Sequence, residues 1–229
     1  MRPIVFIKTD WSAMTPERHE KIVRILNQRQ MDLTVLMEHV ETPHNLAAIA
    51  RTCDAVGIFQ AHAVTNLHAI DLKQRASSGS RKWISVKTHE SLETAFGELR
   101  RNGFTIYCAH LDETAMDFRS VDYTVPTAIV LGTELEGVSP QAVAMADGCI
   151  MVPMFGMIQS LNVSVASALV LYEAQRQRMA KGLYDRRQID DEQFRRLLFE
   201  WGYPKLAPYY RKKGLVYPDL DKRGRIIQG

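Results

Sequence analysis

Three short segments of the chain carry side chains whose types and spacing could do chemistry. The first, residues 43–52, contains Asn45 and, six positions later, Arg51. Asn45 can cap a helix. Arg51 stands beside apolar Ile49 and Cys53, where an arginine either pairs with a carboxylate or binds a phosphate. The segment therefore predicts a helix that can direct both polar side chains to one site.

The second segment, residues 131–139, is a turn in which two glycines flank Glu134 and Glu136. Gly132 would let a ligand approach the backbone closely, because glycine has no side chain to obstruct it. Taken alone, the segment is more typical of an acidic turn in solvent. The sequence leaves both interpretations open.

The third segment, residues 152–178, is an apolar loop followed by a helix. It carries no charge before Glu173, and so long an uncharged run first suggests a membrane helix. Pro153, Gly156 and several polar residues argue against that. Ser160 or Asn162 can cap the helix after the loop. An apolar loop beside polar side chains at a helix start is typical of a ligand pocket, and the alternative is a core helix with an irregular lead-in.

The elements that would position these segments alternate along the chain. Apolar and β-branched runs predict strands over 34–40, 61–65, 85–88, 105–109, 127–131 and 149–152. Caps and helical spacing predict helices over 15–28, 45–57, 91–102 and 139–146, and a long one from 162 whose face is Val165, Ala168, Leu169 and Tyr172. This alternation implies a parallel sheet covered on both faces. Ligands of such sheets bind at the carboxyl ends of strands. The loops 110–112, 132–139 and 153–162 begin at three such strand ends.

Composition indicates one domain, or one domain with appendages, in a reducing compartment. Hydrophobic residues make up 46% of the 229 residues, enough for a substantial core. Cys53, Cys108 and Cys149 lack metal or redox spacing, and no signal peptide is visible. We therefore expect a cytoplasmic protein. The sequence has no phosphate-binding loop and no dinucleotide turn, and its seven histidines lack zinc-ligand spacing, so we expect no metal.

The C-terminal part of the chain is basic. Residues 174–229 contain 14 Lys and Arg against 7 Asp and Glu, a net charge of +7, whereas the rest carries 15 and 19, a net charge of −4. This suggests a polyanionic partner, although a solvated basic surface has the same composition. We predict a helix over residues 193–200, little regular structure over 201–229, and a surface loop with some helix over 71–83. The candidate RNA contacts are Arg186, Arg187, Arg195, Arg196, Arg211, Lys212 and Lys213.

Together, the three segments closely resemble the three motifs of the SpoU branch of the SPOUT superfamily of RNA methyltransferases. Residues 117–119, 163–178 and 197–204 are similar to TrmH-type tRNA (guanosine-2′-O)-methyltransferases, so the resemblance covers roughly residues 44–218. The combination is far more specific than any one motif. The first fourteen residues are not placed by it.

The resemblance implies an α/β fold: a SPOUT-type parallel sheet with helices on both faces, a deep C-terminal trefoil knot, and helical extensions at both termini. Residues 1–30 would form the N-terminal helical extension, 31–181 the knotted methyltransferase domain, and 182–229 a basic RNA-binding extension. It also implies a homodimer whose active sites draw on both subunits. The cofactor would be S-adenosyl-L-methionine, leaving as S-adenosyl-L-homocysteine.

Carried over by position, the family's functional residues fall into two sets. The polar set is Asn45, Arg51, Glu134, Ser160 and Asn162. The cofactor set, acting largely through backbone contacts, is Ala109, Gly132, Val152, Met157 and Leu161. Arg51 is the family's candidate for assisting deprotonation of the ribose hydroxyl. Since free arginine hardly ever deprotonates, we favour phosphate binding and stabilisation of the developing alkoxide.

The implied activity is 2′-O-methylation of the ribose of guanosine 18 in the tRNA D-loop. One alternative is a related ribosomal RNA 2′-O-methyltransferase. Such relatives tend to carry an extra N-terminal domain, for which the roughly forty residues before Asn45 are too few. The other alternative is a non-catalytic RNA-binding dimer. Loss of the Arg51, Glu134 or Asn162 position would favour it, and all three are present.

Overall fold

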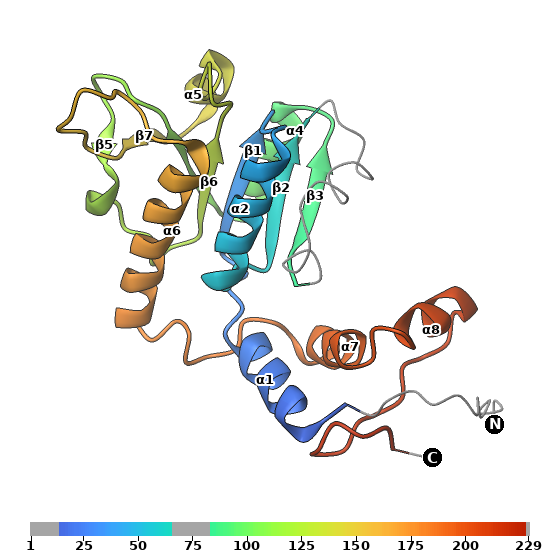
Figure 1. Cartoon of the computed structure of the whole chain (residues 1–229). Coiled ribbons are helices and arrows are strands. Elements are labelled where there is room, and N and C mark those ends of the chain that lie inside the picture. The colour runs from blue at the N-terminus through green and yellow to red at the C-terminus, as the bar shows by residue number, and fades with distance from the viewer. Residues whose placement is uncertain (1–13, 66–82, 228–229) are drawn as a thin grey trace. The chain divides into compact units, whose positions relative to one another are not determined.

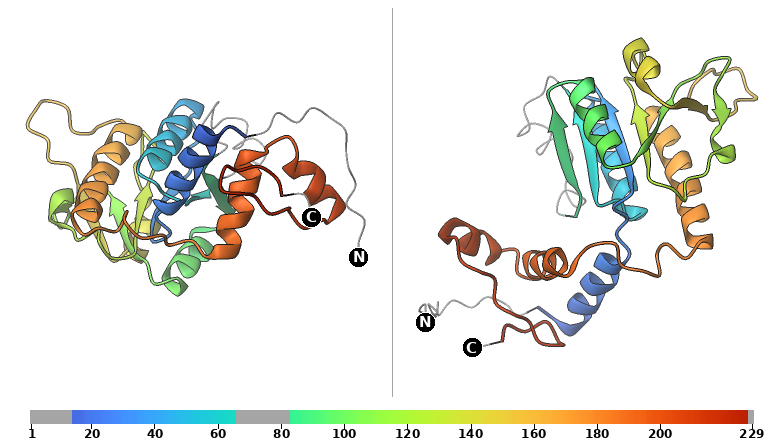
Figure 2. Two further views of the ribbon diagram at one scale, coloured as in Figure 1. Left: turned by 90° about the horizontal axis from the view of Figure 1, so that it is seen from below. Right: turned by 180° about the vertical axis from the view of Figure 1, so that it is seen from behind.

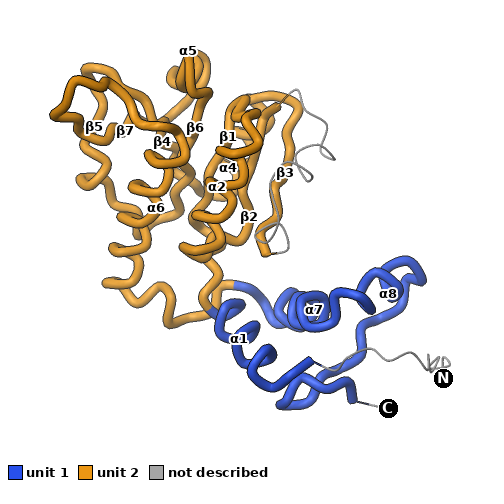
Figure 3. Tube along the Cα trace, in the orientation of Figure 1, with its two compact units in different colours: residues 1–27, 189–229 blue, residues 28–188 orange. Residues whose placement is uncertain are grey.

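The computed structural model describes residues 14–65 and 83–227 of the chain. They divide into two compact units, one of residues 28–188 and one that joins residues up to 27 with those from 189 onward (Figure 3). The predicted loop 71–83 lies, apart from Trp83, outside the described residues. No helix in the described ranges is long and apolar enough to cross a membrane.

The elements follow the predicted order (Figure 1). The helices are α1 (Pro16–Asn27), α2 (Pro43–Ala55), α4 (Leu92–Arg101), α5 (Pro140–Met145), α6 (Val163–Ala180), α7 (Asp191–Gly202) and α8 (Ala207–Lys213), with a short 3-10 helix η2 (Phe118–Ser120). The strands are β1 (Leu33–Glu38), β2 (Gln60–Val64), β3 (Ser85–His89), β4 (Thr105–Ala109), β5 (Met116–Asp117), β6 (Thr127–Leu131) and β7 (Gly148–Met151). The sequence did not predict β5 or η2, which are too short to show a period.

The larger unit is built on a sheet of seven described strands in the order β3-β2-β1-β6-β4-β7-β5. Every neighbouring pair is parallel; Leu36 of β1, for example, pairs with His62 of β2 and with Val130 of β6. β1 and β6 are buried along their whole length. This is expected of parallel strands covered on both faces, and the predicted fold class is confirmed.

Alternate residues of the central strands enter two separate cores, because successive side chains of a strand point to opposite faces. Val35 and Met37 pack in a cluster with Ile49 of α2 and with residues of α6. Leu36, between them, packs in a second cluster with Phe96 of α4. Helices α2 and α6 therefore cover one face of the sheet and α4 the other (Figure 2).

Strand β7 lies between β4 and β5, although both precede it in the chain. After β6 the chain therefore crosses β4, and β7 inserts between β4 and β5, two strands that come earlier in the chain. This order is compatible with the trefoil knot that the resemblance implies. The knot itself stays a prediction.

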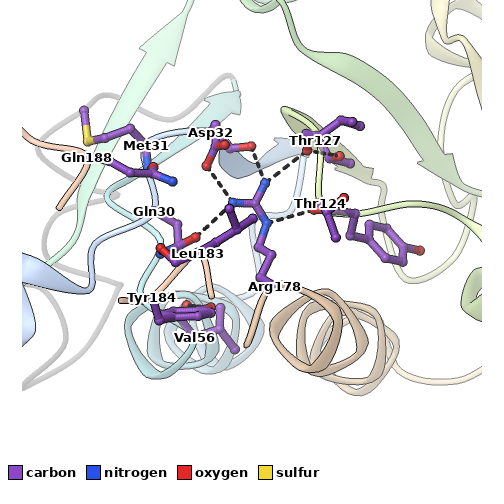
Figure 4. Close-up of polar contacts among 12 residues, drawn as sticks. Gln30, Met31, Asp32, Val56, Thr124, Thr127, Arg178, Leu183, Tyr184 and Gln188 are labelled. Carbon is purple, nitrogen blue, oxygen red and sulfur yellow. Dashed lines mark hydrogen bonds and ion pairs between the residues drawn. The ribbon is translucent and has the colours of Figure 1, made fainter. Parts of the chain in front are cut away.

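A buried arginine fastens the end of α6 to the sheet (Figure 4). Arg178 is fully buried, and all five of its N–H donors are used. Its Nε donates to the Tyr123 carbonyl at 2.8 Å, and its Nη1 donates to Asp32 Oδ1 at 2.6 Å and to Gln30 Oε1 at 3.0 Å. Its Nη2 donates to the carbonyls of Asp32 at 2.9 Å and Val125 at 3.0 Å. One side chain thus joins α6 to segments more than fifty residues away.

Helix α6 is apolar on more than one side. Its buried residues are Ser167, Val170, Leu171, Ala174 and Arg178. The face that the sequence spacing singles out is a different one: Val165, Leu169 and Tyr172 are 47%, 41% and 52% exposed. Periodicity alone could not choose between the two faces, because both are apolar.

The smaller unit is built from both ends of the described chain. Helix α1 packs against α7, and Arg18 Nη2 donates to the Trp201 carbonyl at 2.9 Å. Gly202 permits close packing, since a Cβ there would lie 2.6 Å from the sulfur of Met14. The sequence treats the two terminal segments as separate extensions, whereas in the structure they form one compact unit.

The prediction of little regular structure holds for most of residues 201–229, but this stretch contains one short helix, α8. Pro208 occupies the first turn of the helix, where its missing N–H is not needed. Gly214 ends the helix in the left-handed conformation, with φ of 62°. Tyr210 and Tyr217 contact the ring of Phe199 in α7, with ring centroids 5.5 and 4.6 Å away. Aromatic packing therefore orders a segment whose composition suggests a loop.

Candidate functional site

Three neighbouring strands end at the same edge of the sheet (Figure 1). Ala109, the last residue of β4, pairs in register with Ile150, two residues before Val152. Gly132 directly follows β6 on the other side of β4. Three of the five predicted cofactor residues therefore lie at adjacent strand ends, where parallel sheets bind ligands.

The loop after β6 folds back on itself. Thr133 N donates to the Gly137 carbonyl at 2.9 Å, and Gly137 N donates to the Thr133 carbonyl at 3.1 Å. A Cβ on Gly132 would lie 2.0 Å from the Gly137 oxygen, so a larger residue would force the loop open. Gly137 has a φ of +70°, which glycine adopts without strain. From the sequence, we expect Gly132 to let a ligand approach the backbone. In the structure, a glycine is required there because the backbone of the same loop lies too close for a side chain.

The start of α2 holds the carboxylate of Glu134. Asn45 Nδ2 donates to Glu134 Oε1, and Thr42 Oγ1 donates to Oε2 at 3.0 Å. Asn45 is 3% exposed, whereas Glu134 is exposed. Each carboxylate oxygen thus has one fixed donor and still faces solvent. The first and second predicted segments meet at this contact.

Asn45 is not the cap of α2, so that prediction is wrong. The helix begins two residues earlier at Pro43, with Thr42 in the capping position. Proline is well suited to the first turn of a helix, and this moves the start upstream. As a result Asn45 lies inside the helix and its amide is available for Glu134.

Arg51 lies on the same helix and is exposed. It forms no hydrogen bond or ion pair with any residue in the described ranges. The sequence leaves two roles open, pairing with a carboxylate or binding a phosphate. In the structure the motif carboxylate Glu134 is bound by Thr42 and Asn45 instead.

The third predicted segment meets the first through apolar packing, because its helix α6 packs against α2. Asn162 caps α6 as predicted, with Oδ1 accepting from Ser164 N at 2.8 Å. Ser160 is exposed, and Phe155 and Met157 are 98% and 99% exposed. Large apolar side chains so fully exposed are typical of a binding surface. Within the described residues, no hydrogen bond joins this segment to Asn45, Arg51 or Glu134; Leu161 is half-buried.

The cysteines beside the strand ends are not nucleophiles. All three cysteines are buried and unbonded. Burial raises the pKa of Cys108 to about 12, and burial together with a hydrogen bond donated to Asp112 raises the pKa of Cys149 to about 11. Both thiols are therefore protonated at neutral pH, and thiolate chemistry requires the opposite shift.

Sequence reasoning missed two residues that shape the site. Thr42 fixes one oxygen of Glu134; its position directly before Pro43 is a cap signal that could have been used. Glu38, the last residue of β1, is 4% exposed and accepts a hydrogen bond from Ser139 N at 2.9 Å, so it anchors the far end of the 132–139 loop. The only sequence feature that could have pointed to Glu38 is its position as a carboxylate at the end of an apolar strand.

All seven predicted RNA contacts are exposed. Arg186 and Arg187 belong to the larger unit. The other five lie on α7 and α8 of the smaller unit: Arg195, Arg196, Arg211, Lys212 and Lys213. The basic set is therefore divided between the two units.

Two family models match the chain over nearly its whole length. The model described as the SpoU rRNA Methylase family matches residues 32–172. The model described as SpoU, rRNA methylase, C-terminal, matches residues 176–229. The first covers the sheet and its loops, and the second covers the end of α6 together with α7 and α8.

Individual relatives agree with these matches. The tRNA (guanosine(18)-2′-O)-methyltransferase of Escherichia coli (strain K12) is 48% identical over 215 residues, 93% of this chain and 94% of that protein. The crystal structure of the A. aeolicus TrmH/SpoU tRNA modifying enzyme superposes with a TM-score of 0.74 at 39% identity, over 83% of this chain and 97% of that one. An AdoMet-bound rRNA methyltransferase from Sinorhizobium meliloti superposes with a TM-score of 0.58 at 26% identity, over 67% and 59% of the two chains.

Proposed function

Because the chain belongs to the SpoU rRNA methylase family, we propose that it transfers a methyl group from S-adenosyl-L-methionine to the ribose 2′-hydroxyl of guanosine 18 in tRNA. The substrate follows from the E. coli relative, named for this reaction and 48% identical over almost the whole length. The cofactor follows from the S. meliloti relative, whose structure holds AdoMet.

Two side chains of α2 support the proposal most directly: Asn45, which holds the carboxylate of Glu134, and the cation of Arg51. Asn45 donates to Glu134, while Arg51, exposed on the same helix, has no partner in the described residues. A planar guanidinium matches a phosphate with two parallel hydrogen bonds. The free arginine is therefore best explained by an RNA phosphate.

The residues at the strand ends fit the proposed cofactor chemically. Adenine is a flat, mostly apolar group, and Phe155, Met157 and Ile158 are exposed apolar side chains of the loop after β7. Backbone groups at Ala109 and Gly132 are available at the adjacent strand ends. When bound, the cofactor supplies a methyl group activated by a sulfonium.

Arg51 would act on the RNA in two ways. By binding the adjacent phosphate it would position the ribose oxygen, and positioning supplies much of the rate of such transfers. As the hydroxyl loses its proton, the guanidinium would stabilise the alkoxide that develops. Glu134, held by Thr42 and Asn45, can accept a hydrogen bond from the substrate. Ser160 and Asn162 would complete the polar set at the start of α6.

The proposal includes a homodimer built on α6. Val165, Leu169 and Tyr172, at i, i+4 and i+7, form an exposed apolar stripe that Met179 continues. Such stripes mark protein interfaces, and an isologous contact would bury the same stripe in both copies. A second copy could also supply polar residues to a site in which, among the described members of the predicted polar set, only Asn45 and Glu134 are joined by a hydrogen bond.

The dimer can be tested with one charge. Leu169→Glu would bury a carboxylate in the interface, so light scattering at micromolar concentration should give the monomer mass, and methyl transfer should be lost. Leu215→Glu is the matched control, since Leu215 is 42% exposed in the other unit. A wild-type protein that is monomeric and fully active would refute the dimer.

The remaining parts of the proposal concern RNA and the cell. The basic residues of α7 and α8 would bind tRNA phosphates, so affinity should fall steeply with salt. A truncation that tests this must end after Gln188, because Leu183 and Tyr184 pack in the larger unit; Tyr184 Oη donates to the Val56 carbonyl at 2.6 Å. A tRNA substrate and free buried cysteines both favour the cytoplasm.

The function is tested with two matched tRNA transcripts, one carrying guanosine and one carrying 2′-deoxyguanosine at position 18. With labelled S-adenosyl-L-methionine, the first should gain one methyl group per molecule, mapped to the 2′ oxygen of residue 18. The second should gain none. Equal labelling of both, or labelling of ribosomal RNA alone, would overturn the proposal.

A further inference from the structure

Two histidines lie in contact on the α4 side of the sheet, in its edge strand β3 and the neighbouring strand β2. His62 of β2 is 5% exposed, and its Nδ1 lies 2.8 Å from Nε2 of His89 in the neighbouring strand β3. The two rings meet edge to edge through these nitrogens, with centroids 5.1 Å apart and planes inclined by 19°. Both side chains share a face because His62 pairs in register with Lys87, two residues before His89.

Glu98 of α4 completes a group of three. The ligand atoms of His62, His89 and Glu98 all lie within 4.8 Å of one another. Each residue comes from a different element, so packing of β2, β3 and α4 fixes their spacing. Among the described residues, Lys87 also contacts the group, and its Nζ lies 2.7 and 2.6 Å from the two oxygens of Glu98.

The protonation states are those of metal ligands. Burial, with a smaller contribution from His89, lowers the pKa of His62 to about 4, and burial also lowers the pKa of His89. Both imidazoles are therefore neutral at physiological pH. The hydrogen bond from Lys87 lowers the pKa of Glu98, so its carboxylate is ionised. Neutral imidazole and carboxylate are the forms that bind divalent cations.

We propose that His62 Nδ1, His89 Nε2 and a carboxylate oxygen of Glu98 bind a divalent transition-metal ion of the zinc type. Two imidazoles and one carboxylate are a common ligand set for zinc, with a water in the fourth position. Tetrahedral ligands at ~2.0–2.1 Å stand about 3.3 Å apart. The two histidine nitrogens, hydrogen-bonded at 2.8 Å in the structure, therefore need to separate by about half an ångström, and both rings need to turn so that their lone pairs converge on the ion. The side chain of Lys87, 45% exposed, can turn into solvent to release Glu98.

The sequence predicts no metal because its histidines lack zinc-ligand spacing. His62 and His89 are separated by 27 residues, so only the register of two parallel strands brings them together. The three ligands lie on the face opposite to α2, where Asn45 and Arg51 are found. The metal would therefore join α4 to strands β2 and β3 of the sheet and take no part in methyl transfer.

The test uses tag-free full-length protein, stripped with a chelator and titrated with Co²⁺ and, separately, Zn²⁺. We expect one ion per chain, with the visible absorption of four-coordinate Co²⁺. Glu98→Gln should weaken binding at least tenfold, and His89→Ala should abolish the absorption. Lys87→Met should instead tighten binding, because it removes the competing ammonium. His44→Ala, in which an exposed histidine of α2 is replaced, is the matched control and should leave Co²⁺ binding unchanged.

Several outcomes would overturn the site. They are binding below one tenth of an ion per chain, equal binding by wild type and Glu98→Gln, and weaker binding by Lys87→Met. The Glu98 and Lys87 variants keep the test decisive if the buried histidine variants do not fold, since both side chains are partly exposed. Zn²⁺ should raise the melting temperature of wild type but not of Glu98→Gln. Methyl transfer by the stripped protein should be unchanged, which separates this site from the proposed function.

Discussion

Two arginines of the larger unit show how differently one side chain can be used. Arg178 is fully buried and gives all five of its N–H donors to the chain, at distances from 2.6 to 3.0 Å. Arg51 is exposed and gives none to any residue in the described parts of the chain. Their charge and shape are the same, so the environment alone distinguishes them.

The difference separates residues that stabilise the fold from residues available to a ligand. A guanidinium can be buried only if its charge and donors are matched, and removing it leaves the matching groups unpaired. An exposed arginine without a partner contributes little to stability. Its five donors remain free for a phosphate or an alkoxide. The comparison therefore predicts that replacing Arg178 lowers the stability of the fold, whereas replacing Arg51 lowers the rate of methyl transfer.

Arg178→Ala is expected to have the largest effect. It leaves the Asp32 carboxylate and the Tyr123 carbonyl without the donor that Arg178 supplies, whereas the carbonyls of Asp32 and Val125 keep a donor from Thr127. Breaking such a buried pair costs about 3–5 kcal/mol. Urea unfolding monitored by circular dichroism measures the loss. The control is Arg176→Ala, whose side chain is 68% exposed and pairs with Glu173, and which should cost less than about 1 kcal/mol.

Asp32→Asn keeps the comparison decisive if Arg178→Ala does not fold. The amide retains the shape of the carboxylate but removes its charge, so a smaller loss of stability is expected. If both Arg178→Ala and Asp32→Asn unfold at the wild-type urea concentration, Arg178 does not fasten α6 to the sheet.

Arg51→Ala is expected to leave stability nearly unchanged and to reduce methyl transfer on the order of a hundredfold or more, by analogy with the loss of one oxyanion donor. Melting temperature, S-adenosyl-L-methionine affinity and turnover on tRNA should be measured together. Arg101→Ala is the control, because Arg101 is also exposed but lies on α4. Near-normal turnover of Arg51→Ala would remove Arg51 from the reaction.

Thr42→Val is expected to have a smaller effect on turnover. It removes the donor to Glu134 Oε2 while Asn45 still holds Oε1. One hydrogen bond contributes about 1 kcal/mol, so kcat/KM should fall several-fold. Thr52→Val is the control on the same helix, since the Thr52 hydroxyl donates only to the Ala48 carbonyl. Equal effects of the two variants would show that Thr42 does not position Glu134.

Arg211, Lys212 and Lys213 provide a third kind of basic residue, exposed but far along the chain from the motifs. Their replacement by alanine should weaken tRNA binding while turnover at saturating tRNA stays near wild type. The slope of log affinity against log salt should fall by about 1 for each phosphate that the variant no longer neutralises. An unchanged slope would exclude α8 from the RNA interface.

The sequence predicts the fold well where one physical rule dominates. β1 and β6 are apolar throughout, and the structure buries both in the middle of a parallel sheet. Asn162 caps α6 as its residue type suggests. The sequence could not predict which apolar side of α6 is buried, because Val165 and Val170 are equally apolar and only tertiary packing separates them.

Polar contacts between distant segments were the least predictable. Arg178 reads as an ordinary charge near a helix end, and its burial depends on carbonyls more than fifty residues away. The approach of Asn45 to Glu134 also needs the fold, although the resemblance had placed both in one set. Two histidines 27 residues apart meet only through strand register.

The most direct test of the division between the two arginines is the single-turnover methyl-transfer rate of Arg51→Lys at saturating tRNA and cofactor. Lysine keeps the charge but loses the planar fork that fits a phosphate or an alkoxide. We predict an unchanged melting temperature and unchanged cofactor affinity, with a transfer rate that remains strongly reduced, close to that of Arg51→Ala. A rate near wild type would show that a positive charge alone suffices, and a fall in melting temperature like that of Arg178→Ala would show that Arg51 belongs to the fold. Either result would contradict the distinction drawn between them.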